Sequence, residues 1–438
     1  MTQLMLAYSL AALLLGVVEC EPLLAATPTP TPSPTATPVL CGSSVPCQCG
    51  GTVVGKFTMT ADLSCNGAGL ALSSGAVLDC AGHTITGPGG ATSQFGILVS
   101  QVTGATVRNC RVTGFRRGVR IASGSRNQVA NVEAFANGDP ATHRQGGYGI
   151  DIGSSTDNVI DSCNVHDNAD EGIHVGGGSD RTIVQNTSSM FNYREQLYVL
   201  GNSGTVLAGN RLQSGQQTSS AALFLKDVTG AQVSQNGIWN GNLEIRGSST
   251  GIVIQDTLQI ASGIRFVADG TNVPSGNTVL RSQVAQAFEC VRSNSAVNNS
   301  VVDCVFQSCT SAGVVETSSI TQPAETTLIG ARPPNVTNLD QNSTLQIVWH
   351  LDVTATDSLG RPVAGADVMI TDRYGQGVLK TQTAVDGTIA TADVLSRIAG
   401  TPHKVFSPFH VTASKSGVGT ASTAVLLNKN KTVRLILK

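Results

Sequence analysis

Apolar residues recur along this chain with a period of about 25 residues, the length of one supersecondary unit in a repeat protein. Each repeat has an apolar residue, a small or amide residue three positions later, and another apolar residue five positions later. The repeats begin at Val77, Val107, Val129, Ile160, Ile183, Leu207, Val233, Val253, Val279 and Val301. Three positions later come Cys80, Cys110, Val132, Cys163, Asn186, Asn210, Asn236, Asp256, Ser282 and Cys304. If the repeats stack, these residues form one column, in which asparagine amides hydrogen-bond along the stack.

A second pattern has five residues with glycine in second place. It occurs as FGILV at 95–99, RGVRI at 117–121, YGIDI at 148–152, EGIHV at 171–175 and SGIRF at 262–266. The alternation predicts short strands with one buried face. No helical period appears. Parallel strands without crossover helices can bury their apolar faces only by winding into a parallel β-helix.

These patterns resemble those of the right-handed parallel β-helix (PbH1 repeat) proteins, the group that holds pectate lyases, mannuronan C5-epimerases and NosD-like periplasmic proteins. The resemblance implies an all-β fold with a right-handed parallel β-helix of about ten coils over residues 41–320. The architecture hosts many functions, so it does not define an activity.

The period is lost after a linker expected at residues 321–344. The segments DSLGRPVAGADV at 357–368 and TAVDG at 383–387 resemble the carboxypeptidase-regulatory or transthyretin-like sandwich. Asp386-Gly387 is a hairpin turn signal, and about seven strands fit in the remaining residues. We therefore expect a small Ig-like β-sandwich at 345–438, acting as a spacer or adhesion module, with carbohydrate binding as an alternative.

The N-terminus predicts export. Residues 4–18 form an apolar run of signal-peptide length, so residues 1–26 are interpreted as a signal peptide, with a membrane anchor as the alternative. The Pro/Thr-rich residues 27–40 predict an extended linker. We expect a secreted, periplasmic or cell-surface protein without membrane insertion once the signal is removed.

The cysteines also indicate an oxidising compartment, because ten remain after Cys20 leaves with the signal. Five of them crowd the start of the β-helix, where disulfides would seal an open end, or where a metal could bind: Cys41, Cys47, Cys49, Cys65 and Cys80. Cys110 and Cys163 lie two coils apart and should not bond to each other.

Composition narrows the class of partner. The formal net charge is −2 and only 13% of residues are charged, so the protein has no overall basic field for nucleic acid. With 40% apolar residues, the chain is not disordered. Clusters of ionisable side chains therefore stand out.

The residue between the two apolar positions of each motif, which is its fourth residue, should point outward. This predicts one row on the outer face, formed by Leu98, Arg120, Asp151, His174, Tyr198, Phe224, Glu244 and Arg265. The residues before the glycines, together with Glu195 at the equivalent position, add a flanking row of Arg117, Tyr148, Glu171 and Glu195. These rows indicate either a binding face for an extended polymer or an ordinary solvated sheet.

Two features favour a binding face. One coil carries an insertion at residues 136–147, which includes Arg144, and extra loops on solenoids commonly wall a binding surface. Residues 80–132 contain six arginines and no Asp or Glu, and arginine suits carboxylates such as those of uronic acids.

Tyr148-Gly-Ile-Asp151 and the later His166-Asp167-Asn168 resemble the mannuronan C5-epimerase pattern. The resemblance implies that Tyr148 and Asp151 act in the site. This chain departs from the pattern at three positions. Gly153 and Glu195 stand where the family has histidine, and Gly176 stands where it has aspartate.

Proton abstraction beside a uronate carboxylate needs a cation, a base and a proton donor. We assign His174 as the base, Tyr148 or Tyr198 as the donor, and Asp151 as the group that orients His174. Substrate binding is assigned to Arg117, Arg120, Arg144, Glu171 and Glu195. The expected function is binding, and modification of lyase or C5-epimerase type, of an anionic polysaccharide.

Two other functions stay open. One is a non-catalytic β-helix scaffold or adhesin, and the other is a glycoside hydrolase that uses Asp151 with Glu171 or Glu195. No cofactor is expected. Asp167, Asp170 and Glu171 could hold Ca²⁺ or could be turn residues. The oligomeric state does not follow from the sequence.

Overall fold

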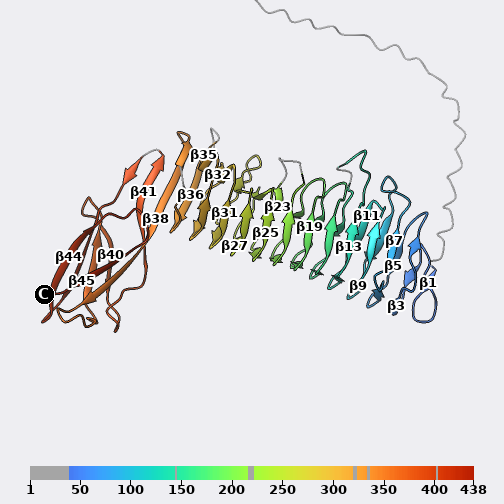
Figure 1. The fold of residues 1–438 in the computed structure, drawn as a ribbon, viewed down its shortest axis with the longest axis horizontal. Coiled ribbons are helices and arrows are strands. Elements are labelled where there is room, and N and C mark those ends of the chain that lie inside the picture. The colour runs from blue at the N-terminus through green and yellow to red at the C-terminus, as the bar shows by residue number, and fades with distance from the viewer. Residues whose placement is uncertain (1–38, 144–145, 216–220, 319–322, 333–335, 401–402) are drawn as a thin grey trace, which may run out of the picture. The chain divides into compact units, whose positions relative to one another are not determined.

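The computed structural model describes residues 39–143, 146–215, 221–318, 323–332, 336–400 and 403–438. Within these ranges every regular element is a strand (Figure 1). The strands build a right-handed parallel β-helix followed by further strands, which confirms the expected fold class. The expected signal peptide, most of the Pro/Thr-rich linker and Arg144 lie outside the described residues.

Three sheets form the walls of the β-helix; their strands are parallel throughout the coils, and only the last strands of the third sheet pair antiparallel. Sheet A holds, in spatial order, β1 (Leu40–Cys41), β2 (Thr52–Val53), β5 (Leu70–Leu72), β8 (Phe95–Ser100), β11 (Arg117–Ala122), β14 (Ile150–Gly153), β17 (Ile173–Val175), β20 (Leu197–Leu200), β23 (Ala221–Lys226), β26 (Asn242–Arg246), β29 (Ile264–Val267), β32 (Glu289–Asn294), β35 (Ala312–Thr317) and β37 (Val336–Leu339).

Sheet B holds β4 (Leu63–Ser64), β7 (Thr84–Thr86), β10 (Arg111–Thr113), β13 (Glu133–Phe135), β16 (Asn164–His166), β19 (Ser188–Met190), β22 (Arg211–Gln213), β25 (Gly237–Trp239), β28 (Leu258–Ile260), β31 (Gln283–Ala285) and β34 (Val305–Gln307).

Sheet C holds β3 (Lys56–Thr58), β6 (Val77–Asp79), β9 (Thr106–Arg108), β12 (Gln128–Ala130), β15 (Val159–Asp161), β18 (Ile183–Gln185), β21 (Val206–Ala208), β24 (Gln232–Ser234), β27 (Val253–Gln255), β30 (Thr278–Leu280), β33 (Asn299–Val302), β36 (Ala324–Ile329), β38 (Ser343–Thr356), β41 (Ala392–Gly400) and β42 (Lys404–Val405), with β45 (Lys431–Ile436) beside β38.

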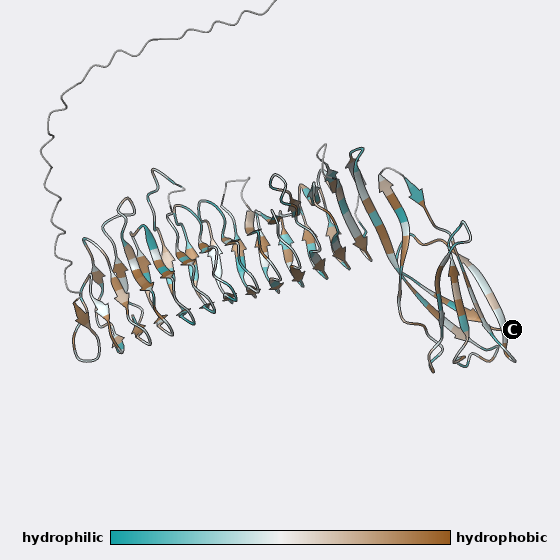
Figure 2. Cartoon of the chain, turned by 180° about the vertical axis from the view of Figure 1, so that it is seen from behind, coloured by the Kyte–Doolittle hydropathy of each residue, from teal (hydrophilic) through white to brown (hydrophobic). Residues whose placement is uncertain are grey.

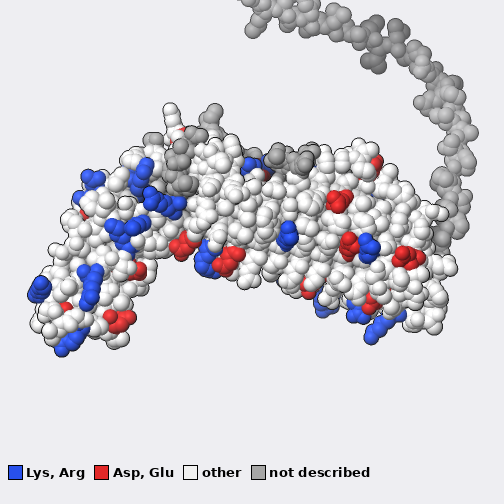
Figure 3. Space-filling view, viewed as in Figure 1, with Lys and Arg blue, Asp and Glu red and all other residues white. Residues whose placement is uncertain are grey.

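The core lies inside the coils, because alternate residues of each strand point inward. Ile121, Ile152, Val175 and Val199 are fully buried and follow one another on successive strands of sheet A. Apolar segments recur in the same way along the coils (Figure 2). On the face drawn in Figure 3, the few charges of the β-helix are scattered, while Lys and Arg predominate over the C-terminal strands.

The repeat register differs by one residue at three of the expected starts. Leu78, Val184 and Ile254, rather than Val77, Ile183 and Val253, align with Val107 and its equivalents. Asn186 and Asp256 therefore leave the interior column and become exposed turn residues with positive φ. In each of these pairs two adjacent residues are apolar, so alternation alone cannot choose between them.

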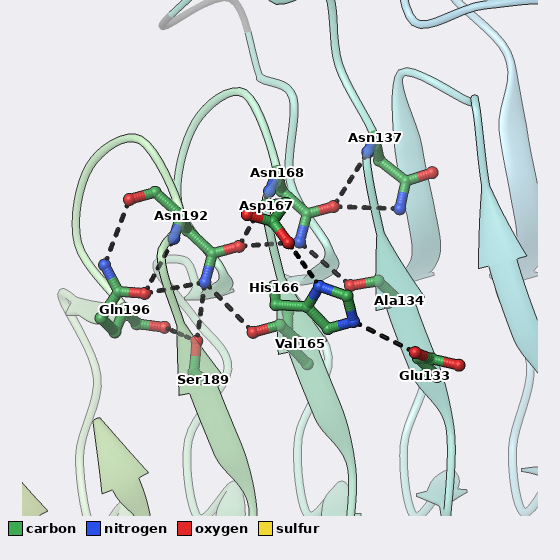
Figure 4. A network of polar contacts seen from close by, with 10 residues as sticks. All are labelled: Glu133, Ala134, Asn137, Val165, His166, Asp167, Asn168, Ser189, Asn192 and Gln196. Atoms are coloured by element: carbon green, nitrogen blue, oxygen red, sulfur yellow. Dashed lines mark hydrogen bonds and ion pairs between the residues drawn. The ribbon is translucent and has the colours of Figure 1, made fainter. Parts of the chain in front are cut away.

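Asparagine stacking does occur, most extensively at the turn that follows sheet B (Figure 4). The amide of Asn137 donates to Asn168 Oδ1 at 3.0 Å, and that of Asn168 donates to Asn192 Oδ1 at 2.8 Å. Asn192 in turn donates to Gln196 Oε1 at 2.8 Å. These amides satisfy one another away from water.

Eight cysteines form four disulfides. Three disulfides lie near the start of the β-helix, namely Cys41–Cys47, Cys49–Cys65 and Cys80–Cys110. The fourth is Cys290–Cys309. Cys110 does not pair with Cys163, as expected. Cys163 and Cys304 are buried thiols.

After the β-helix, β39 (Asp367–Thr371), β40 (Gly377–Gln382), β43 (Phe409–Lys415) and β44 (Gly419–Val425) form the four-stranded antiparallel sheet D. Together with β38, β41 and β45, sheet D is consistent with a small sandwich. The segment 321–344 contains β36 and β37, which continue sheets C and A. Among the described residues, no helix has the length and apolarity to cross a lipid bilayer.

Candidate functional site

The expected outward row is present on sheet A. Arg120 of β11 pairs in register with Asp151 of β14, Asp151 with His174 of β17, and His174 with Tyr198 of β20. Leu98 precedes the row, and Phe224, Glu244 and Arg265 continue it. Glycine at second place in the motif allows close packing: a Cβ on Gly118 would meet the Gly149 carbonyl at 2.6 Å.

Asp151 lies at the centre of this row but is only 1% exposed, because longer side chains cover it. Its Oδ1 lies 2.9 Å from His174 Nδ1. Its Oδ2 lies 2.9 Å from Arg117 Nε and 2.5 Å from Arg120 Nη1. Both oxygens of this buried carboxylate are therefore engaged, as burial of a charge requires.

His174 sits between two tyrosines. Its ring stacks on Tyr148 with centroids 4.8 Å apart and meets Tyr198 at 5.4 Å. The Arg117 guanidinium lies 5.3 Å from the centre of the Tyr148 ring, a cation–π distance. Because a carboxylate can only accept, Nδ1 of His174 donates to Asp151, and in the neutral ring Nε2 then carries the lone pair.

Two of the departures from the epimerase pattern have a steric basis. A Cβ on Gly153 would lie 2.8 Å from the Arg120 guanidinium, and one on Gly176 would lie 3.0 Å from the His174 ring. Glycine at these positions leaves the space that Arg120 and His174 occupy.

A second cluster joins three carboxyl groups to one arginine. Arg194 Nη1 lies 2.8 Å from Glu171 Oε1 and 3.5 Å from Asp170 Oδ1, and Arg194 Nε lies 3.3 Å from Glu195 Oε2. Burial raises the pKa of Glu171 to about 8, and the charge of Asp170 adds to the shift. Glu171 therefore favours its protonated form at neutral pH.

The charges of the two clusters influence the pKa values of Tyr148 and Tyr198. Burial raises the pKa of Tyr148 far above its ordinary value, and the charges of Glu171 and Asp170 raise it further. Burial also raises the pKa of Tyr198 to about 12. Both phenols are therefore protonated at neutral pH.

The sequence reasoning missed Arg194, which sits on the turn before β20 and holds Glu171 and Glu195 together. In the sequence, the position of Arg194 directly before Glu195 is the feature that could have identified it. The residues considered for Ca²⁺ do not converge: Asp167 pairs with His166 at 2.7 Å, while Asp170 and Glu171 face Arg194. The described part of the chain contains no group of three or more metal-ligating side chains.

Comparison with known proteins places the fold among right-handed parallel β-helices. Residues 61–212 match the family model described as the right handed beta helix region. No curated protein sequence matches the chain.

Several solved structures are similar to this chain. The A-module of the Azotobacter vinelandii mannuronan C-5 epimerase AlgE6 has 14% identity and a TM-score of 0.45, with 68% of this chain and 90% of that chain covered. PfbA, a surface adhesin of Streptococcus pneumoniae, has 10% identity and a TM-score of 0.39, with 76% and 91% covered. The catalytic unit of the Streptomyces thermodiastaticus GH87 α-1,3-glucanase has 11% identity and a TM-score of 0.45, with 68% and 64% covered. At such identities the likeness concerns the fold alone.

Proposed function

We propose that this chain binds an acidic, uronate-containing polysaccharide on the outer face of sheet A and abstracts the proton beside the uronate carboxyl group. The observation that carries the proposal is the hydrogen bond from His174 Nδ1 to the buried Asp151 carboxylate, flanked by two arginines. This bond orients the ring and leaves Nε2 as the base. The His174 side chain is 17% exposed, so a ligand on this face can reach it.

The remaining groups complete the reaction. Arg117 Nε and Arg120 Nη1 form ion pairs with Asp151, and both side chains are partly exposed, so their other N–H groups can bind the uronate carboxylate. His174 Nε2 takes the proton from C5. In a lyase, the C4–O bond then breaks as the C4–C5 double bond forms, and a tyrosine protonates the leaving oxygen. In an epimerase, a tyrosine returns a proton to C5 from the opposite face.

The reaction is tested with alginate, polymannuronate and pectate. We expect either an unsaturated product that absorbs in the ultraviolet or a changed uronate composition by NMR. His174→Ala should lower kcat at least ~100-fold, the usual worth of a general base. His166→Ala is the matched control, because His166 also contacts carboxylates but lies on sheet B, and its kcat should stay at the wild-type value. Wild-type turnover that survives in His174→Ala would remove the mechanism.

A non-catalytic scaffold or adhesin is the second candidate. The closed ion network around Asp151 favours it, since such a network also stabilises a solvated sheet without any reaction. In that case no polymer is turned over, and His174→Ala binds polysaccharide as well as the wild type does. A glycoside hydrolase has less support, because both oxygens of the Asp151 carboxylate already face His174, Arg117 or Arg120.

We also propose that the protein is exported and that its C-terminal strands form a separate module. Four disulfides together with the apolar residues 4–18 support an exported protein, either secreted, periplasmic or displayed on the cell surface. The strands at 345–438 would serve as a carboxypeptidase-regulatory-like spacer or adhesion module.

A further inference from the structure

Phe191 occupies a position that suits a different kind of residue. After nearly every strand of sheet B, the next residue turns the chain in the left-handed conformation; these residues are Gly114, Ala136, Asp167, Phe191, Asn240, Ala261, Gln286 and Ser308. Glycine, asparagine and aspartate adopt this conformation most readily, and a bulky aromatic residue adopts it at a cost. Phe191 has a φ of 56° there and is 48% exposed. Phe191 therefore has neither a relaxed backbone conformation nor a fully buried side chain.

A cavity of about 260 Å³ opens beside Phe191. The inserted segment supplies Pro140 and His143 to its lining, and Tyr193 lies on the turn that also carries Phe191. The rings of His143 and Tyr193 stack with centroids 3.7 Å apart and planes 5° apart. His143 Nδ1 lies 3.3 Å from the Ala169 carbonyl oxygen, which holds the ring against the coil. The cavity thus has aromatic walls supported by the insertion.

Polar groups at the same cavity suit the hydroxyls of a sugar. The exposed Asp167 carboxylate lines it and can accept hydrogen bonds from hydroxyl groups. Aromatic faces pack against the C–H face of a pyranose ring, which is apolar. A cavity of this size holds about one sugar residue.

We propose that the cavity lined by Phe191, Tyr193 and His143 is a binding subsite for one sugar residue of the polysaccharide, recognised by its ring face and hydroxyls. The turn that carries Phe191 and Tyr193 continues directly into Arg194, Glu195 and β20, which bears Tyr198. A polymer on sheet A can therefore extend over the turn into the cavity. The subsite rests on the proposed function for its polymer but not for any chemical step.

Phe191→Asn tests the subsite, because asparagine suits the left-handed turn and removes the aromatic wall. Hexasaccharides of galacturonate, mannuronate and cellulose are titrated calorimetrically into the full chain. We expect Kd for the bound hexasaccharide to rise about tenfold in Phe191→Asn while Tm stays the same or increases. Phe288→Ala removes a phenylalanine that is 69% exposed elsewhere and should change neither quantity.

The outcomes separate the two proposals. If Phe191→Asn binds like the wild type while Tyr198→Ala binds more weakly, the subsite is wrong and the proposed face stands. If Phe191→Asn weakens binding but no polymer is turned over, the subsite stands and the proposed reaction is wrong. A lower Tm in Phe191→Asn, with unchanged Kd, would show that Phe191 serves the fold instead. If the wild type binds none of the hexasaccharides, both proposals fall.

Discussion

At the scale of single residues, this chain buries few ionisable groups, and each buried one depends on its partners. Asp151 has two arginines and a histidine. Glu316 lies on β35 of sheet A. Its side chain is fully buried, and no cation is among its described contacts. Burial raises the pKa of Glu316 to about 8, although the hydroxyls of Thr326 and Ser293 act in the opposite direction. Asp340 and Glu325 raise it further.

Glu316→Gln should stabilise the protein above neutral pH. The native state keeps a proton on Glu316 that the unfolded chain loses near its ordinary pKa of 4.5, so stability falls as pH rises from about 4.5 to about 8. The variant should remove this slope and gain roughly 2–4 kcal/mol at pH 8. Urea unfolding at pH 5 and pH 8 measures the effect. Glu289→Gln is the control, because Glu289 lies half-buried on β32 and is not among the groups that shift the pKa of Glu316; an equal gain there would contradict the assignment.

At the scale of elements, the turns after sheet B depend on stacked asparagines rather than on apolar packing. Asn168 donates to Asn192 Oδ1 and to the Ala134 carbonyl, and accepts from Asn137 (Figure 4). Its backbone N–H also donates to Asn192 Oδ1. The side chain of one coil thus satisfies the backbone of the next.

Asn168→Ala should lower the free energy of unfolding by about 2–4 kcal/mol, because it removes several buried hydrogen bonds and leaves their partners unpaired. Asn164→Ala is the matched control. Asn164 lies half-buried on β16 of the same coil, in strand conformation and with no side-chain hydrogen bond among the described residues, so the loss should stay within about 0.5 kcal/mol. The midpoint of urea unfolding, followed by circular dichroism, measures both. Equal losses would show that the stack does not stabilise the coils.

At the scale of the whole molecule, a histidine links the β-helix to the strands that follow. His350 of β38 lies 2.8 Å from Asp303, on the turn after β33, and 2.6 Å from Asp393 of β41. Burial lowers the pKa of His350, but the hydrogen bonds to Asp303 and Asp393 outweigh burial and raise the pKa above its ordinary value. Both ring nitrogens donate only when the ring is protonated.

This contact should weaken as the pH rises. A raised histidine pKa means that its stabilisation is complete below the unfolded value near 6.5 and is lost as pH rises through the folded pKa. Hydrogen exchange of β38 and β41 should therefore quicken between pH 6 and pH 8.5, beyond the intrinsic increase of exchange with pH. In His350→Gln this extra change should be absent. A wild-type profile that persists in the variant would place the pH dependence elsewhere.

Much of this architecture follows from the sequence, because alternation dictates which side chains of a strand point outward. The glycine motif placed Arg120, Asp151 and His174 in one row, and the alternation of the next strand added Tyr198. Alternation failed only where two adjacent residues are both apolar, as at Ile183 and Val184, and there contacts between coils decide which one is buried.

What only the tertiary structure decided is how the long side chains use that row. The register of this row predicts that residues on adjacent strands lie about 4.8 Å apart. It does not predict that the side chains of Arg117 and Arg120 cover Asp151 and bury it. Nor does it predict that Arg194 would gather three carboxyl groups. Flexible charged side chains choose partners by the space and desolvation they meet, and those depend on neighbouring coils that are distant in sequence.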